Sequence, residues 1–463
     1  MTSNTNQYSE QQLKKPGRKK VRLLMIILSA CLFVFMIACL RTVYTKLSKG
    51  VAIALDWNKF ILKAEIGTEG YRGPVAARAY GYIGLAAYES ALPGFDGDFQ
   101  SMASRYPDLK LPAAPDPKQF NLSASLNACY ATLLGRFFMS APEPIQKEQR
   151  QLFLQWEKKL MKDLDSTEYR ISKEYGINVG IAVYDWSATD SLGFRANHHN
   201  YDRSFVPPVG DGMWVVSSDF PMPPLLPYWG KVRPFIIKTE NYLAKPLPEY
   251  SSESNQFYHI QSLEILTLSQ PLSPENQWIA EFWSDDHPGL TFTPAGHWLS
   301  ITNQVIEKEH PAIEKTLETY LKTGFALTDA MIACWNSKYY YNHERPETFI
   351  KKYLAKDWRP HSPTPSFPTY PSGHSMMGAA SAVVLTSLYG EDYAMTDRSH
   401  EGLEDIVIKP RSFHSFDEMA KENALSRLFL GVHFRFDCDE GLRLGGLIGE
   451  EVSRLQLEKN LTQ

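Results

Sequence analysis

The feature that most constrains the fold is the spacing of apolar residues, which is helical over long stretches. Apolar side chains recur at the i, i+3, i+4 interval within Ala76–Leu92, Ser125–Phe138 and Glu148–Leu164, as in helices that bury one face. The alternation typical of strands is scarce. The segment Pro207–Pro234, dense in Pro and Gly but also carrying Trp and Tyr, predicts a long, packed loop. We therefore expect one all-α body made of two helical halves.

The composition argues against several classes of protein and site. The chain has 463 residues, of which 43% are hydrophobic and 22% charged, so a large core is available. A net charge of −4 gives no reason to expect nucleic acid as a partner. The five cysteines show no CxxC spacing. Neither a zinc site nor a disulfide framework is indicated, and we expect free, mostly buried thiols.

The N-terminus carries a charge-free stretch, Leu23 to Leu40, directly after the basic segment Lys14–Arg22. Its eighteen residues just suffice to cross a bilayer as a helix, and the basic flank favours a cytoplasmic N-terminus. A cleaved signal peptide and a lipidated cysteine are the alternatives. Cys39 fits lipidation better than Cys31, because cleavage at Cys31 leaves apolar residues exposed. Each alternative places the body outside the cytoplasm, in the periplasm or at the surface of a bacterial cell.

The first of three charged clusters spans Thr328–Pro346. Lys338 and Arg345 are seven residues apart, two helical turns, so we expect both on one helix face and expect Pro346 to end that helix. Two cations on one face repel each other unless they share an anion. Taken alone, the cluster is better explained as a solvated face with Glu344 as partner.

The second cluster lies within Pro365–Gly390. Ser372 stands at the N-cap position of a helix rich in small residues, and Gly373 permits close approach to the backbone. Free N–H groups at a helix start bind anions, and His374 in the first turn could exchange a proton with a bound group. An ordinary capped helix with a surface histidine explains this segment equally well.

The third cluster runs to Asp437. The capping box Ser415–Glu418 predicts a helix that reaches Arg427. We expect Gly431 to break or kink this helix, so that Arg427 and His433 can face the same way. Asp437, one turn after His433, could orient the imidazole by a hydrogen bond. A histidine–aspartate pair that only supports a helix is the alternative.

Together the clusters provide what a tetrahedral oxyanion needs: fixed positive charge, hydrogen-bond donors, a nucleophile and an acid–base group. Arg435 lies outside this set, and we expect it to pair with an acid such as Asp439. His343 and His297 could lie at the rim of such a site but are expected to be structural.

The order and spacing of these residues resemble the signature shared by vanadium-dependent haloperoxidases and type 2 phosphatidic acid phosphatases. The matching elements are Lys338-x6-Arg345-Pro346, Pro371-Ser372-Gly373-His374 and Ser426-Arg427-x5-His433-x3-Asp437. A looser similarity to bacterial haloperoxidase-like proteins extends from about Ala76 to the end of the chain. The resemblance implies an α-helical bundle, in haloperoxidases two four-helix bundles.

The resemblance also implies a role for each residue. His433 would bond vanadium in a peroxidase or attack phosphorus in a phosphatase, His374 would be the general acid–base, and Asp437 would orient His433. Five groups would neutralise or bind the oxyanion oxygens: Lys338, Arg345, Arg427, the Ser372 hydroxyl and the Gly373 amide. Trp335 and Phe367 resemble aromatic residues near the halide in chloroperoxidases, with core positions as the alternative. The carboxylate that often supports the third arginine cannot be placed by spacing.

Vanadate and phosphate share shape and charge, so the signature fits two activities on small molecules. We predict a haloperoxidase that uses hydrogen peroxide to oxidise a halide at vanadate. No second segment of membrane length follows the first, and the residues around the motifs resemble those of chloroperoxidases. The alternative is an exported acid phosphatase without a cofactor, which hydrolyses phosphomonoesters through a phosphohistidine at His433. A non-catalytic binding protein is a third possibility, and no oligomeric state is predicted.

The predicted organisation has four parts: a basic tail (1–22), the apolar segment (23–40), a linker (41–75) and an all-α domain (76–455) that contains the signature (328–437).

Overall fold

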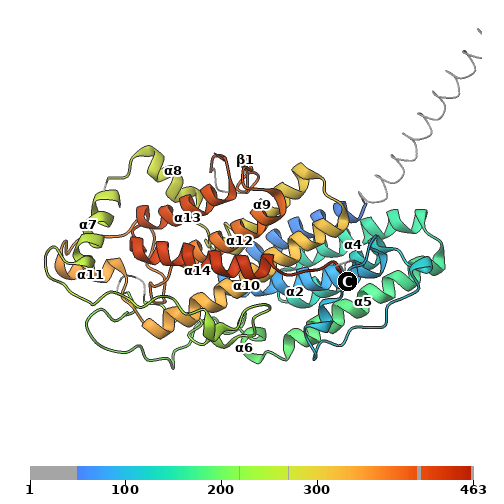
Figure 1. The fold of residues 1–463 in the computed structure, drawn as a ribbon, viewed down its shortest axis with the longest axis horizontal. Helices are drawn as coiled ribbons and strands as arrows, with labels where there is room; N and C mark the ends of the chain where they lie inside the picture. Colours follow the sequence, from blue (N-terminus) through green and yellow to red (C-terminus); the bar gives the residue numbers. More distant parts are fainter. Residues whose placement is uncertain (1–48, 218, 220, 270, 404–407, 460–463) are drawn as a thin grey trace, which may run out of the picture. The chain divides into compact units, whose positions relative to one another are not determined.

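A computed structural model describes residues 49–217, 219, 221–269, 271–403 and 408–459 (Figure 1). The chain divides into a compact body, Gly50–Gln463, and an N-terminal part, Met1–Lys49. The apolar segment 23–40, with Cys31 and Cys39, lies outside the described residues. Among the helices that are described, none combines the length and apolar character needed to span a membrane.

The body is helical, which confirms the predicted all-α class; its helices are α2 (Gly73–Ala91), α3 (Leu122–Phe137), α4 (Glu143–Asp163), α5 (Ser166–Ala188), α6 (Ser191–Phe194), α7 (Phe257–Ser269), α8 (Pro274–Phe282), α9 (Pro294–Glu309), α10 (Ile313–Tyr341), α11 (Pro346–Tyr353), α12 (Gly373–Tyr389), α13 (Phe416–Phe429) and α14 (Arg435–Ser453). Short 3₁₀ turns lie at Leu92–Gly94, Met102–Ser104, Pro117–Gln119, Trp229–Lys231 and Thr239–Asn241. Strands β1 (Met395–Asp397) and β2 (Arg411–Phe413) form one antiparallel hairpin in which Thr396 faces Ser412.

Helix α10 connects two groups of packed helices. It packs against α2, which in turn contacts α3 and α5, and it also packs against α12 and α14, which contact α13 (Figure 1). Two of the close approaches between these helices need glycine. A Cβ at Gly324 of α10 would lie 2.7 Å from the carbonyl oxygen of Tyr80, and one at Gly445 of α14 would lie 2.3 Å from that of Met376. These two contacts therefore set how closely α10 packs on α2 and α14 on α12.

The three predicted amphipathic segments coincide with α2, α3 and α4. The segment 41–75, expected to be a linker, contains instead a helix over residues 49–67 with Trp57 fully buried. Its indole N–H donates to Asn127 Oδ1 at 2.9 Å, which ties this helix to α3, so the compact body begins before residue 76. The region 207–234 is the predicted packed loop, since Trp214 and Trp229 are buried within it.

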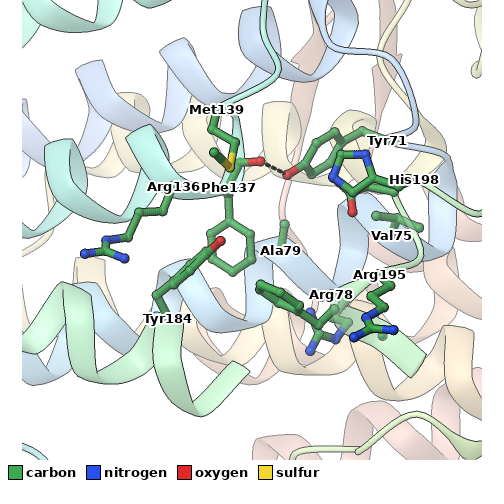
Figure 2. A pocket seen from close by; sticks show the side chains of 13 residues that line it. Tyr71, Val75, Arg78, Ala79, Arg136, Phe137, Met139, Tyr184, Arg195 and His198 are labelled. Carbon is green, nitrogen blue, oxygen red and sulfur yellow. Dashed lines mark hydrogen bonds between the residues drawn. The ribbon is translucent and has the colours of Figure 1, made fainter. Parts of the chain in front are cut away.

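A cavity of about 210 Å³ opens among α2, α3, α5 and α6 (Figure 2). Arg78, Arg136 and Tyr184 are among the side chains that line it. None of its lining residues belongs to the three charged clusters. The cysteines of the described body, Cys129, Cys334 and Cys438, are free and buried, as predicted.

Candidate active site

Lys338 lies in the last turn of α10 and is fully buried. Its ammonium group donates hydrogen bonds to the carbonyl oxygens of Pro368 (2.9 Å) and Thr369 (2.7 Å). Burial lowers the pKa of Lys338 to about 7, and the neighbouring positive charge of Arg345 acts in the same direction. A buried lysine next to a second cation is not a solvated face, so that explanation of the first cluster is wrong.

Arg345 reaches the same place by a route that differs from the prediction. Helix α10 ends at Tyr341, where Asn342 adopts a left-handed conformation with φ 47°, which asparagine tolerates better than most residues. Pro346 then begins α11, with Arg345 as its N-cap residue, because proline suits the first turn of a helix. The prediction of one helix face ended by Pro346 is therefore wrong, although the guanidinium still lies near Lys338.

The Arg345 side chain makes three contacts and leaves one nitrogen unused. Nε donates to the carbonyl oxygen of Phe367 (3.0 Å), and Nη1 donates to that of Val432 (2.8 Å) and lies 3.3 Å from His433 Nε2. Nη2 is buried and has no partner among the described residues. Burial lowers the pKa of Arg345 to about 9, which leaves the guanidinium charged at neutral pH.

The start of α12 has the predicted cap. Ser372 is the N-cap residue and its hydroxyl accepts from the Ser375 amide at 3.4 Å, while its own amide donates to the Asp437 carbonyl at 2.9 Å. His374 stands in the first turn with a buried Nε2 that has no described partner. Burial, followed by the charge of Arg427, holds the pKa of His374 well below its usual value. His374 is therefore neutral in the free site.

The third cluster also folds as its sequence predicts. Helix α13 begins after Ser415, whose hydroxyl accepts from the Glu418 amide at 3.1 Å. The chain breaks between α13 and α14 at Gly431, where φ is +75°. Arg427, near the end of α13, donates through Nη1 to the carbonyl oxygen of Trp283 at 3.0 Å, whereas its buried Nε has no described partner.

His433 is held by Asp437, as expected from their spacing. Its Nδ1 lies 3.1 Å from Asp437 Oδ2, which also accepts from the Phe434 amide at 3.0 Å and from the Thr369 hydroxyl. Burial and the charge of Arg345 hold the pKa of His433 well below its usual value, so the ring is neutral. Burial raises the pKa of Asp437 to about 6. At neutral pH Nδ1–H therefore donates to the carboxylate, and Nε2 carries the lone pair, which faces Arg345 Nη1.

These residues form one buried site around His433 Nε2. It combines three cations, Lys338, Arg345 and Arg427, with two guanidinium nitrogens, Arg345 Nη2 and Arg427 Nε, that lack a protein partner among the described residues. Leaving a buried donor unpaired costs about 1–3 kcal/mol. Such an arrangement is typical of a site that receives its acceptors from a bound anion.

Comparisons with known proteins found vanadium haloperoxidases that resemble this chain. Residues 318–459 match the family model described as the VCPO second helical-bundle domain. The vanadium chloroperoxidase of Curvularia inaequalis is 22% identical over 456 residues, covering 79% of this chain and 74% of that protein. The crystal structure of the first bacterial vanadium-dependent iodoperoxidase superposes with a TM-score of 0.76 at 28% identity, covering 88% of this chain and 97% of that one. This chain is similar to vanadium haloperoxidases in its fold and, over residues 318–459, in its sequence. A holo-type bacterial vanadium-dependent chloroperoxidase, with a TM-score of 0.59 at 17% identity over 82% of this chain and 92% of that one, shares the fold.

In this haloperoxidase fold the two aromatic residues singled out by sequence lie together against the cations. The rings of Trp335 and Phe367 have centroids 5.0 Å apart. Lys338 Nζ lies 5.0 Å, and Arg345 Cζ 4.9 Å, from the centroid of the Phe367 ring. Trp335 is buried and donates its indole N–H to the Leu225 carbonyl at 3.2 Å, whereas Phe367 is partly exposed. Phe367 is thus the more accessible of the two.

Sequence reasoning missed two polar residues of this buried site. Thr369 bridges Asp437 and His433, and its hydroxyl lies 3.1 Å from His433 Nδ1. Burial lowers the pKa of Arg427 to about 10. The negative charge of Asp285, in the loop after α8, is the strongest influence that raises this pKa. Thr369 lies two residues before the second motif, so its position in the sequence could have indicated a place in the site. Nothing in the spacing relates Asp285 to Arg427.

Arg435 pairs with a different acid from the one expected. Its guanidinium lies 2.6 Å from Glu264 of α7, so the partner is an acid, as predicted, but it is Glu264 and not the example given, Asp439. Arg435 opens α14 and is bonded to a helix distant in sequence, which neighbouring residues do not reveal. Arg435 thus takes no part in the cluster of cations.

Proposed function

We propose that this protein is a vanadate-dependent haloperoxidase that uses hydrogen peroxide to oxidise a halide. The observation that carries the proposal is the convergence of three buried cations on the neutral His433 ring, with two guanidinium nitrogens that have no partner in the described part of the chain. The relatives reported above are named as vanadium chloroperoxidases and a vanadium iodoperoxidase. They favour the peroxidase over the exported acid phosphatase.

The residues present fit vanadate. His433 Nε2 would bond vanadium, since Asp437 fixes the opposite ring nitrogen. The anion's oxygens would be held by the residues that supply charge and donors: Lys338, Arg345, Ser372, Gly373 and Arg427. Bound vanadate would supply a Lewis-acidic centre at which hydrogen peroxide becomes reactive toward halide. Arg345 Nη2 and Arg427 Nε, which no described residue pairs with, support this assignment.

His374 would act as the acid–base group. It is neutral because burial and nearby cations hold its pKa down, and its Nε2 has no described partner. An anion bound beside it offsets those cations and raises the pKa of the ring. His374 could then accept a proton from peroxide as it binds and return one as product leaves.

The test uses the full-length protein loaded with orthovanadate, given hydrogen peroxide and iodide, bromide or chloride, with halogenation of a dione reporter as readout. Vanadate-free protein is assayed in parallel on phenyl phosphate. Halide oxidation that depends on vanadate is the expected result. Ester hydrolysis that vanadate inhibits, without halide oxidation, would establish the phosphatase instead. Vanadate binding alone does not discriminate, because both activities need an oxyanion site.

The affinity for sulfate should fall as the pH rises above about 7. Lys338 is charged below its lowered pKa of about 7 and neutral above it, so anion binding at higher pH must first restore a proton. The expected slope approaches a tenfold loss per pH unit. Sulfate keeps one charge state over this range, so the slope reports on the protein. Calorimetry between about pH 6 and 8 measures it, below the lowered pKa of Arg345 of about 9. The Lys338→Met variant should have a clearly shallower slope, and a flat wild-type profile contradicts the assignment.

Trp335 and Phe367 are proposed to line the approach of the halide. Phe367 is partly exposed and covers both Lys338 and Arg345, so a smaller side chain there leaves more room and a more polar path. We expect Phe367→Leu to change the ratio of kcat/KM for iodide and bromide by about threefold to tenfold. The buried Trp335 can be tested by Trp335→Phe. Unchanged ratios in both variants would assign these residues to packing alone.

The apolar segment Leu23–Leu40 supports a proposal on location. It would anchor or export the protein, with the helical body that begins at Gly50 outside the cytoplasm. Cell fractionation and mass spectrometry of the mature N-terminus test this. Recovery of the intact chain in the cytosolic fraction would contradict it, while a lipid on Cys39 would separate lipidation from a retained helix.

A further inference from the structure

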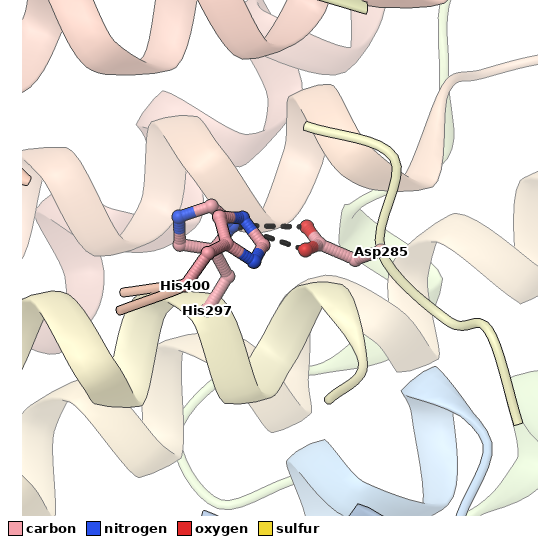
Figure 3. A group of neighbouring side chains, drawn as sticks. All are labelled: Asp285, His297 and His400. Carbon is pink, nitrogen blue, oxygen red and sulfur yellow. Dashed lines mark hydrogen bonds and ion pairs between the residues drawn. The ribbon is translucent and has the colours of Figure 1, made fainter. Parts of the chain in front are cut away.

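A second buried charged cluster is centred on His297, in the first turn of α9 (Figure 3). His297 Nδ1 lies 3.1 Å from both carboxylate oxygens of Asp285, and Nε2 lies 3.0 Å from Asp397 Oδ2. All three side chains are fully buried. The imidazole is therefore held between two carboxylates, one from the loop after α8 and one from the end of β1.

The geometry requires a charged ring. A neutral imidazole has one N–H, so one of the two carboxylates would face a lone pair. Burial by itself lowers the pKa of His297, but Asp285 and Asp397 outweigh it and raise the pKa to about 10. The Trp283 ring stacks on the imidazole with centroids 4.6 Å apart, a contact that favours a cation. His297 is thus an imidazolium at neutral pH.

Asp285 links this cluster to the oxyanion site. Arg427 donates to the carbonyl oxygen of Trp283 at 3.0 Å, two residues before Asp285 along the same loop. The negative charge of Asp285 is also the strongest influence that raises the pKa of Arg427, against the lowering caused by burial. The positive charge of His297 reaches His374, whose pKa it helps to lower after burial and Arg427. The two clusters therefore lie within electrostatic range of each other.

We propose that His297 is a positioning residue of the oxyanion site. One ring nitrogen bonds Asp397 and the other bonds both oxygens of Asp285, and His297 thereby holds the Asp285 carboxylate where its charge acts on Arg427. Asp397 anchors the imidazolium, since its other oxygen accepts from Gln304 at 3.0 Å and from the Ser399 amide at 2.9 Å. His297 touches none of the groups that would contact the anion and acts through Asp285. The inference rests on the proposed function only in that the site binds a tetrahedral oxyanion.

A divalent metal is the competing occupant of this cluster. Ligand atoms of Asp285, His297 and His400 lie within 4.8 Å of one another. His400 Nδ1 is buried without a described partner, while its Nε2 lies 2.8 Å from the Phe282 carbonyl oxygen. A metal would have to displace the proton that His297 donates to Asp285. Because both nitrogens of His297 already have carboxylate partners, the geometry favours the imidazolium.

The experiment measures vanadate affinity of the full-length His297→Gln variant by calorimetry, with the ⁵¹V resonance of the bound anion as a second readout. We expect an affinity about 10- to 100-fold weaker and a shifted resonance, because the carboxylate whose charge stabilises the Arg427 cation is no longer held in place. Binding is measured without peroxide or halide, so a failure of the peroxidase proposal leaves this test intact. His310→Asn, at an exposed left-handed position (φ 46°) that ends the same helix, is the matched control and should bind normally.

A double-mutant cycle separates positioning from general damage. If His297 acts through Asp285, adding His297→Gln to Asp285→Asn should cause little further loss. If His297→Gln does not fold, Asp397→Asn takes its place in the test, because asparagine keeps the shape of the side chain. This variant should weaken vanadate binding about tenfold. Additive losses, or normal affinity in a folded variant, would overturn the proposal. So would equimolar zinc in the purified protein that His400→Gln removes, because the cluster would then be a metal site.

Discussion

Replacing His433 by alanine should abolish vanadate-dependent halide oxidation, by at least about a thousandfold, while the protein stays folded. Within the described site, His433 is the only neutral imidazole whose ring is oriented by a carboxylate, that of Asp437. Its other nitrogen, Nε2, faces the Arg345 guanidinium at 3.3 Å. No neighbour can replace it, because His374 has no such carboxylate among its described contacts. The loss of the ring leaves a small buried cavity, with a stability cost of about 1–3 kcal/mol.

The measurement is the rate of dione halogenation at saturating vanadate, together with near-ultraviolet circular dichroism and Tm. His259→Ala, which removes a partly buried histidine of α7, controls for the loss of an imidazole elsewhere and should keep full activity. Substantial activity in folded His433→Ala would refute the mechanism. Asp437→Asn should give an intermediate loss of about 10- to 100-fold, because it disturbs only the orientation of the ring.

Replacing Lys338 by methionine should weaken vanadate binding about 10- to 150-fold, the equivalent of about 1.5–3 kcal/mol for a hydrogen bond to a charged group. Methionine keeps most of the volume but removes the charge. It also leaves the carbonyl groups of Pro368 and Thr369 without the donor they have now, so part of the effect will appear as lower stability. The affinity is read by calorimetry and the stability by urea denaturation.

The chain offers a close control for this variant. Lys322 lies on the same helix, is also buried and pairs with Glu318 at 2.7 Å, but makes no contact with the candidate site. Lys322→Met should lower the free energy of unfolding without changing vanadate affinity. Equal losses of affinity in both variants would show that any buried charge on α10 matters, and the specific role of Lys338 would be withdrawn.

Much of the site could be predicted from sequence because it depends on neighbours in the chain. The N-caps at Ser372 and Ser415, the break at Gly431 and the pairing of His433 with Asp437 involve residues at most four positions apart. Such local contacts follow from helix geometry alone. The apolar spacing predicted α2, α3 and α4 for the same reason.

The failures of prediction have a common cause. The position of Arg345 depends on the left-handed turn at Asn342 and on contacts with Phe367 and Val432, none of which the seven-residue spacing to Lys338 reveals. The pairing of Arg435 with Glu264 likewise joins α14 to α7. Spacing within a helix cannot indicate which distant element supplies a partner.

The sequence by itself determined the helical class, the starts and breaks of the site helices, and the types of charged and titratable groups available. Only the tertiary structure decided that three cations are buried together, that Thr369 and Asp285 join them, and that His297 is clamped between two carboxylates. The physical reason is that local structure depends on contacts within about one helical turn. The pKa values and unpaired donors that define the chemistry depend instead on desolvation and on charges brought together by packing of segments far apart in the chain.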